Sequence, residues 1–193
     1  MRWRRGKKEG EPQAPPAAAP EGGRALVVPR AALRRTHDYF LPYWRAGVET
    51  ACFWFGVGDG GVQAVTTVAA PKLYQTGGNY SVDMPSLRRL AAAMRGQGLT
   101  NLAQVHTHPS AWVDHSPYDD ERAYSTRDGA LSLVWADYGS GLSYDLSGVG
   151  VHERRGGVWV RLEEREAGER VRLVDDFADF RWRIEGGGIR DEE

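Results

Sequence analysis

The order of predicted elements indicates one domain of the α/β or α+β class, a mixed sheet with helices packed on it. Apolar runs at Glu49 to Val57 and Ala130 to Ala136 are typical of strands covered on both faces. Stretches of helical periodicity stand between the strand patterns, as after Arg30 and after Asp83. The length of 193 residues suits a single domain with a sizeable core.

Composition narrows the class of protein. The formal net charge of −1 gives no global case for binding nucleic acid or a membrane surface. No apolar stretch approaches the ~20 residues of a membrane helix, and no hydrophobic region follows the basic N-terminus as in a secretory signal. The single cysteine, Cys52, excludes an internal disulfide and lies in an apolar run, which favours a buried structural thiol. We therefore expect a cytoplasmic protein, and the richness in Ala, Gly and Arg suggests a bacterial source.

The first part of the chain predicts a tail, a strand and a helix. Residues 1–24 form a basic and Pro/Ala-rich stretch without periodicity, which indicates disorder. We expect the domain to span residues 25–185, with a flexible C-terminus at residues 186–193. It should open with a strand at Ala25 to Pro29 and a helix from about Arg30, which Pro42 should end or kink. The predicted buried face of this helix consists of Leu33, His37, Phe40, Leu41 and Trp44.

The middle of the chain predicts a hairpin and a second helix. The strand Glu49 to Val57 should pair with Val62 to Ala69 across a glycine-rich turn. Pro71 to Asp83 is interpreted as a loop. A helix should follow from Asp83 to Gly96, with a buried stripe of Leu87, Leu90, Ala91 and Met94.

The last part of the chain predicts five more strands and one short helix, which should run to about Ser125. The segment Glu163 to Arg172 is interpreted as a solvated face because its charges are mixed. Asp175 to Trp182 is expected to pack as a final helix or arm. The expected strands are Asn101 to His108, Ala130 to Ala136, the hairpin of Leu146 to His152 with Val158 to Leu162, and Val171 to Val174.

The chemistry of the chain concentrates at His106-Thr107-His108-Pro109. On a strand, His106 and His108 would point to the same face and offer a pair of metal ligands. Pro109 cannot donate to a sheet ladder, so the strand should end there. Taken alone, a His-x-His pair in a strand is more often incidental than a metal site.

A helix start follows seven residues later. Ser116 would cap this helix, Pro117 would occupy its first position, and Asp119 would face its N-terminus. Two imidazoles and one carboxylate brought together would form a catalytic zinc set with one position open. Taken alone, Ser-x-x-Asp before a helix is an ordinary capping motif.

The combination His106-x-His108-Pro109, six residues, Ser116, two residues, Asp119 resembles the JAMM motif of the JAB/MPN metalloproteases. This family also has a glutamate upstream, and Glu49 stands in the matching place. The resemblance spans roughly residues 25–162. It implies a curved mixed sheet flanked by helices, related in shape to the cytidine deaminases. It also implies one zinc ion bound by His106, His108 and Asp119.

The resemblance assigns roles to the remaining motif residues. Glu49 would accept a proton from the activated water and pass it to the leaving nitrogen. Ser116 would donate a hydrogen bond to the oxyanion of the tetrahedral intermediate. Trp112 and Tyr118 border the motif and are candidates for walls of a substrate channel, with packing roles equally open. His115 is interpreted as a loop residue or substrate contact because the family motif does not use it.

The family cleaves bonds after the C-terminal glycine of ubiquitin and ubiquitin-like proteins. The expected function is therefore a deubiquitinase-like isopeptidase or peptidase acting on a ubiquitin-like protein or its conjugates. The cognate activating and conjugating enzymes are possible partners. The alternative is a catalytically silent MPN scaffold subunit, although such members usually lack a motif residue. A zinc deaminase is excluded because it needs His-x-Glu and a Pro-Cys-x-x-Cys pair, and a chain with one cysteine cannot supply that pair.

Overall fold

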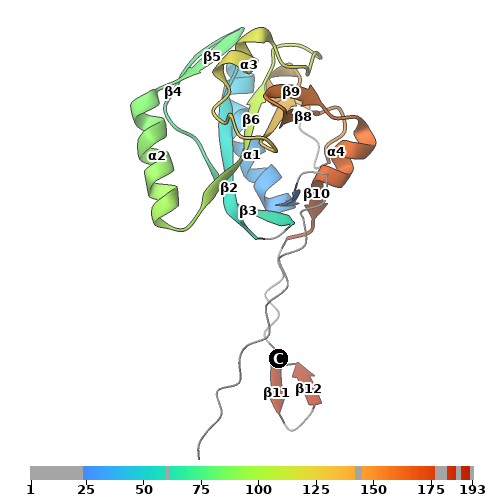
Figure 1. The fold of residues 1–193 in the computed structure, drawn as a ribbon. Helices are drawn as coiled ribbons and strands as arrows, with labels where there is room; N and C mark the ends of the chain where they lie inside the picture. Colours follow the sequence, from blue (N-terminus) through green and yellow to red (C-terminus); the bar gives the residue numbers. More distant parts are fainter. Residues whose placement is uncertain (1–23, 60, 142–144, 177–181, 186–187, 192–193) are drawn as a thin grey trace, which may run out of the picture.

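The computed structural model describes residues 24–59, 61–141, 145–176, 182–185 and 188–191, and it contains a mixed eight-stranded sheet (Figure 1). The strand order is β10-β1-β3-β2-β6-β7-β8-β9. The inner strands β2 and β6 pair antiparallel, whereas β6 and β7 pair parallel. In chain order the strands are β1 Ala25–Pro29, β2 Ala51–Asp59, β3 Val62–Ala69, β6 Thr100–Thr107, β7 Leu131–Trp135, β8 Gly150–Arg155, β9 Val158–Arg161 and β10 Val171–Val174.

The helices lie on and around this sheet. Helix α1 (Arg30–Ala46) lies across one face, α2 (Met84–Gly96) stands at one side, and α4 (Glu164–Arg170) lies beside β10 (Figure 1). The short helix α3 (Pro117–Arg122) follows the end of β6. The prediction of one α+β domain with a mixed sheet and flanking helices is confirmed.

The core forms where α1 covers the central strands. Trp54 of β2 and Trp135 of β7 pack edge to face, and Phe40 of α1 packs against Trp135. The indole Nε1–H of Trp54 donates to the buried Thr36 hydroxyl at 2.9 Å, so this core donor is satisfied. Cys52 is fully buried in the same cluster, as predicted.

Helix α1 departs from the prediction at its C-terminal half. It does not end at Pro42 but continues to Ala46. Pro42 is exposed, so its ring faces solvent and only one backbone hydrogen bond is lost. Gly47, at φ 64°, ends the helix instead. The placement of Trp44 on the buried face is wrong, since its exposure is 37%. The buried residues of the helix are Ala32, Leu33, Thr36 and Phe40.

The loop predicted at Pro71 to Asp83 is instead a second hairpin. Strands β4 (Leu73–Thr76) and β5 (Asn79–Val82) pair antiparallel across the two-residue turn Gly77-Gly78. Tyr80 and Val82 are buried and pack with Ala51, whereas Asn79 and Ser81 point away. This period-two alternation over four residues is the signal that was missed.

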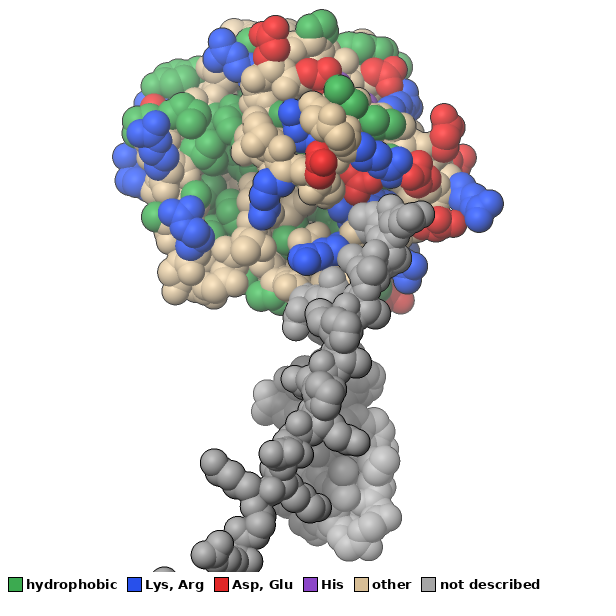
Figure 2. All heavy atoms as spheres, viewed as in Figure 1, with side chains coloured by type: hydrophobic (Ala, Val, Ile, Leu, Met, Phe, Trp, Pro, Cys, Tyr) green, Lys and Arg blue, Asp and Glu red, His purple; other side chains and the backbone are tan. Residues whose placement is uncertain are grey.

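Helix α2 begins and ends as predicted, but its apolar stripe is only half-buried. Asp83 caps it, its side chain accepting from the Ser86 N–H at 2.8 Å. The helix stands at the side of the sheet (Figure 1), and Leu87 of its stripe packs against the cluster that contains Tyr80 and Val82. Hydrophobic and basic side chains are both open to view on this side of the molecule (Figure 2).

Three boundaries in the C-terminal half differ from prediction. Helix α3 ends at Arg122 rather than near Ser125. Strand β8 begins at Gly150 rather than Leu146, because a turn in which Val149 N–H donates to the Leu146 carbonyl precedes it. The segment interpreted as a solvated face contains α4, whose last residue, Arg170, is buried. The Arg170 Nε–H donates to the buried Glu153 carboxylate at 2.6 Å.

Two predicted segments fall largely outside the described residues. These are the N-terminal tail at residues 1–24, of which only Arg24 is described, and most of the arm at 175–182. Strands β11 (Trp182–Glu185) and β12 (Gly188–Asp191) form a separate two-stranded antiparallel sheet. Among the described residues, no helix combines the length and apolar character that crossing a bilayer requires.

Candidate metal centre

Strand β6 brings the two histidines of the motif together at its C-terminal end. His106 is fully buried and His108, the first residue after the strand, is 4% exposed. Their ring centroids lie 5.1 Å apart. Thr107 between them is also buried, and its hydroxyl accepts from the Thr50 N–H at 3.0 Å. The prediction that both imidazoles reach one region is therefore confirmed.

Helix α3 brings the carboxylate to the same place. Ser116 caps the helix and Pro117 occupies its first turn, as predicted. The Asp119 Oδ2 accepts from the Ser116 N–H at 2.8 Å and from its hydroxyl at 2.6 Å. The Asp119 N–H donates back to the Ser116 hydroxyl at 3.2 Å. This reciprocal capping box holds the carboxylate in one orientation.

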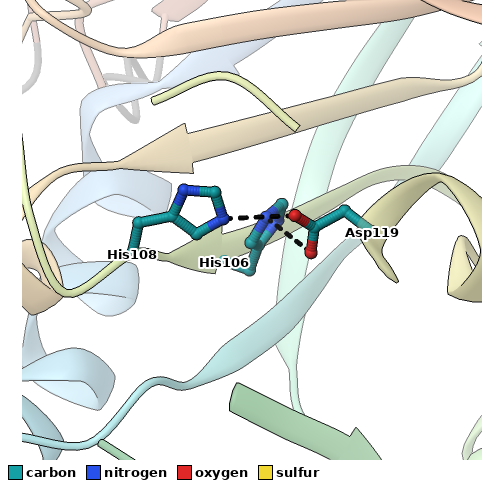
Figure 3. A group of neighbouring side chains, drawn as sticks. All are labelled: His106, His108 and Asp119. Atoms are coloured by element: carbon teal, nitrogen blue, oxygen red, sulfur yellow. Dashed lines mark hydrogen bonds and ion pairs between the residues drawn. The ribbon is translucent and has the colours of Figure 1, made fainter. Parts of the chain in front are cut away.

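The three side chains converge on one point, as Figure 3 shows. The Nε2 of His106 lies 3.4 Å from the Asp119 Oδ1, and the Nε2 of His108 lies 3.2 Å from its Oδ2. One ligand atom from each residue lies within 4.8 Å of the others. Both ring nitrogens of His106 are buried without a hydrogen-bond partner, which is costly for an imidazole. This donor set fits a divalent metal ion, because coordination would use an otherwise unsatisfied nitrogen.

The pKa shifts of His106 and Asp119 favour the protonation states that bind a cation. Burial lowers the pKa of His106 to about 3, so its ring is neutral and able to ligate. Burial alone would lower the pKa of His108, but the Asp119 carboxylate reverses this and raises it above its ordinary value. Although burial opposes it, the hydrogen bond from His108 and the nearby His106 hold the pKa of Asp119 well below its usual range. Asp119 is therefore ionised near neutral pH.

Glu49 lies two residues before the start of β2, at the edge of the same site. Its N–H donates to the Thr76 carbonyl at 2.9 Å, and its own carbonyl accepts from the Gln75 amide at 3.1 Å. These bonds tie it to the β4–β5 hairpin. Burial raises the pKa of its carboxyl to about 7, while His108 lowers it and Asp119 raises it further. Such a carboxyl can exchange a proton near neutral pH.

A pocket of about 280 Å³ opens over the triangle. Trp112 stacks on the His108 ring, with centroids 5.2 Å apart and planes at 19°. The Trp112 carbonyl accepts from the His108 Nδ1–H at 3.1 Å, which leaves Nε2 facing Asp119. Six of the seven residues singled out from the sequence line this pocket, and the seventh, His106, is buried beside His108. Its lining includes Glu49, Gly78, Asn79, His108, Pro109, Ser110, Trp112, Ser116, Tyr118 and Asp119.

Sequence reasoning missed Tyr138, which follows β7 in a short 3-10 turn (Asp137–Gly139). Asp137 and Tyr138 have φ angles of 50° and 58°, which side-chain-bearing residues rarely adopt. The Tyr138 N–H donates to the His108 carbonyl at 2.7 Å, and its hydroxyl donates to the Gly77 carbonyl at 2.8 Å. It therefore ties the chain after the histidine pair to the tip of the β4–β5 hairpin. The local sequence gives no signal for the positive φ angles of Asp137 and Tyr138.

A pH-dependent stability is expected from His152, buried at 3% exposure on β8. Burial lowers its pKa to about 3, whereas an unfolded imidazole titrates near ~6.5. Between these two pH values the unfolded chain therefore binds more protons at this residue than the folded chain does. The contribution of the neutral His152 to the free energy of unfolding is lost as pH falls below ~6.5. Glu49 has a raised pKa and therefore stabilises the fold as pH falls. Comparing the unsubstituted protein with a variant that lacks only His152 isolates the effect of this histidine.

When pH is lowered from 7.5 to 5, the unfolding free energy of His152→Phe should rise by about 2 kcal/mol relative to that of the unsubstituted protein. Urea unfolding of both metal-free proteins at the two pH values measures this. Parallel pH profiles for the two proteins would contradict it.

A mixed sheet and a short helix that bring two imidazoles and a carboxylate into one triangle, with a buried glutamate beside them, define a metallopeptidase. The probable metalloprotease y4jG of Sinorhizobium fredii is 33% identical over 121 residues, covering 61% of this chain and 74% of that protein. No protein-family model matches the chain. The chain belongs to the JAB/MPN family of metalloproteases, whose motif residues it carries.

Solved structures resemble the chain in fold. A protein from Desulfitobacterium hafniense superposes with a TM-score of 0.58 at 15% identity, over 78% of this chain and 94% of that one. A JAB1/MPN domain protein from Archaeoglobus fulgidus gives a TM-score of 0.41 at 17% identity, over 72% and 96% of the two chains. The first of these likenesses supports a shared fold, and the second is too weak to argue from.

Proposed function

We propose that the protein is a zinc-dependent isopeptidase or peptidase that hydrolyses the bond after the C-terminal glycine of a ubiquitin-like protein. The observation that carries the proposal is the triangle of His106, His108 and Asp119 under a pocket that Glu49 also lines. This deubiquitinase-like activity would serve either deconjugation or precursor processing. The cognate activating and conjugating enzymes would act in the same pathway, in the bacterial cytoplasm.

Zinc is the metal that this donor set suits best. Two imidazoles, one carboxylate and an open position are typical of catalytic zinc sites, and thiolates are absent from the triangle. His106, His108 and Asp119 would hold the ion, since the two Nε2 atoms lie 3.4 Å from Oδ1 and 3.2 Å from Oδ2 of the carboxylate. When bound, zinc would polarise the scissile carbonyl and lower the pKa of a water molecule toward ~7.

Glu49 is proposed as the proton carrier. Its carboxyl lines the pocket and has a pKa raised to about 7, so it can accept a proton from the attacking water and then release it. Its main-chain hydrogen bonds with the Gln75 side-chain amide and the Thr76 carbonyl hold it at the hairpin rather than in the His-x-His strand. That position supports a role beside the metal without ligation. The proton would pass to the nitrogen of the departing amine.

Ser116 is proposed to serve two functions. Its hydroxyl hydrogen is directed at the Asp119 Oδ2 in this structure, so it orients that carboxylate. Because Ser116 also lines the pocket, rotation of the hydroxyl would let it donate to the oxyanion of the tetrahedral intermediate. Oxyanion donors of this kind contribute ~3 kcal/mol to the chemical step in other hydrolases.

The form of the pocket supports a slender peptide tail as substrate. Trp112 and Tyr118 lie on the motif side of it, and Gly78 and Asn79 of the hairpin tip line it as well. The pocket has a volume of about 280 Å³ and opens to solvent, so an extended chain end can enter it. A glycine-ended tail is such a chain end. Trp112 is 49% exposed and offers an apolar surface to such a tail.

The test is cleavage of a ubiquitin-like protein fused through its terminal glycine to a reporter, using protein loaded with zinc. Release of the reporter at the glycine bond, read by mass spectrometry, is the expected result. A matched fusion with leucine in place of the terminal glycine should be cleaved at least ~10-fold more slowly. Zinc binding without cleavage of ubiquitin-like fusions would contradict the proposal and favour the scaffold alternative.

A further inference from the structure

The candidate ligand Asp119 and its neighbour Ser116 lie on a long connection between β6 and β7 that contains little regular structure. Its helix, α3, has only six residues. A helix this short gains little stability by itself, so other contacts must hold the connection in place. The position of Asp119 relative to the two histidines depends on those contacts.

His115, directly before Ser116, makes a buried polar contact from this connection to β7, whereas the neighbouring Asp114 pairs with Arg161 of β9 at the surface. Its Nδ1 lies 2.9 Å from the Asp120 Oδ1, and its Nε2 lies 2.9 Å from the Ser132 hydroxyl on β7. The carboxylate only accepts, so Nδ1–H donates to Asp120 and Nε2 accepts from Ser132 in the neutral ring. The side chain is 5% exposed. One imidazole thus joins the cap region of α3 to a buried strand.

Ring contacts fix the plane of this imidazole. His115 stacks on His152 of β8 with centroids 4.0 Å apart and planes at 19°. Trp159 of β9 contacts it edge to face at 5.1 Å, and the candidate ligand His106 lies 5.7 Å away. Four of the five histidines of the chain therefore form one contiguous group, with His37 outside it.

The order Ser132, His115, Asp120 has the hydrogen-bond pattern of a serine hydrolase triad, but burial excludes that role. Ser132 is 1% exposed, so no substrate carbonyl can reach its hydroxyl. The three residues therefore act on the structure of the metal site rather than on a substrate.

We infer that His115 is a positioning residue that holds Ser116 and Asp119 against β7 and so presets the metal site. The inference rests on the proposed metal site, not on the identity of the substrate. Fixing His115 fixes the backbone of Ser116, and two bonds from Ser116 then orient the Asp119 carboxylate. In other metalloproteins, removing a residue that hydrogen-bonds to a metal ligand weakens metal binding by about 10- to 100-fold.

The experiment measures the zinc affinity of the full chain by competition with a chelator, together with the visible spectrum of the cobalt-substituted protein. His115→Ala should weaken zinc binding by about 10- to 100-fold and change the cobalt spectrum. His115→Asn, which keeps a donor for Asp120, should restore part of the affinity. Ser132→Ala, which removes one hydrogen bond, should give a smaller loss. His37→Ala is the matched control and should leave affinity and spectrum unchanged.

Unchanged zinc affinity and an unchanged cobalt spectrum in both His115→Ala and Ser132→Ala would overturn the inference, whatever happens to the melting temperature. If His115→Ala does not fold, Ser132→Ala and His115→Asn decide the matter by the same two measurements. Zinc binding without peptidase activity in the unsubstituted protein would refute the proposed function while this comparison still stands. Absence of zinc binding in the unsubstituted protein would refute both.

Discussion

Replacing Glu49 by glutamine should slow peptide hydrolysis by a factor of about 100 or more, while fold and metal content stay unchanged. The amide is nearly isosteric with the carboxyl but cannot accept a proton. The hydrogen bonds of residue 49 with the Gln75 side-chain amide and the Thr76 carbonyl use only main-chain atoms of residue 49, so they survive the substitution. Single-turnover cleavage of the glycine-linked fusion, measured beside zinc content, gives the result.

The pH dependence of peptide hydrolysis gives a second test of the role of Glu49. The carboxyl of Glu49 has a pKa raised to about 7 by burial, so its basic form is lost as pH falls below that value. A cation bound beside it would move this limit to lower pH. The acid limb should therefore be present in the unsubstituted enzyme and absent from the residual activity of Glu49→Gln. Glu121→Gln, on the exposed side of α3, is the matched control and should retain full activity.

Equal activity in Glu49→Gln and the unsubstituted protein would eliminate Glu49 as the proton carrier. Loss of zinc together with activity would instead make Glu49 a ligand. The two results are separable because zinc content is measured on the same samples.

His108→Ala and Asp119→Ala should each reduce bound zinc from near one per chain to below about one tenth. Each substitution leaves two candidate ligands, and the buried His106 ring keeps its unsatisfied nitrogens. Elemental analysis of protein purified without added metal measures the loss, with cleavage of the fusion as the functional readout. His37→Ala and Asp128→Asn remove the same residue types away from the triangle and should retain the metal.

The zinc-dependent rise in melting temperature should disappear in the same two variants, because a ligand that binds only the folded state stabilises it. Full zinc content in both variants would mean that the metal is held elsewhere. Loss of zinc with unchanged cleavage would contradict a metal-dependent mechanism.

Much of the site follows from sequence because it is local. His106 and His108 alternate with Thr107 on one strand, and strand geometry alone directs both to one face. Ser116, Pro117 and Asp119 form a capping box whose spacing is written in the sequence. The strand–helix order likewise indicated the mixed sheet, since buried strands are recognisable as apolar runs. These features depend on neighbours within a few residues.

Predictions went wrong where the environment overrode a local preference. Pro42 does not end α1, because its ring faces solvent and Gly47 supplies the terminating conformation. The segment around Gly77 and Gly78 is a hairpin rather than a loop, because Tyr80 and Val82 find a surface to bury against. The charged segment before β10 contains the buried Arg170, because Glu153 of β8 compensates its charge.

The sequence by itself determined the residue types of the metal site, their spacing and the strand and helix that carry them. Only the tertiary structure decided how the site is held together. His115 contacts Ser132 and His152, which follow it by 17 and 37 positions, and Tyr138 reaches the tip of the β4–β5 hairpin, 61 positions before it. Such pairs leave no periodic trace in a single sequence, since they arise from sheet order and chain crossing. The motif specifies which atoms can bind a metal, and the packing of distant strands sets where those atoms lie.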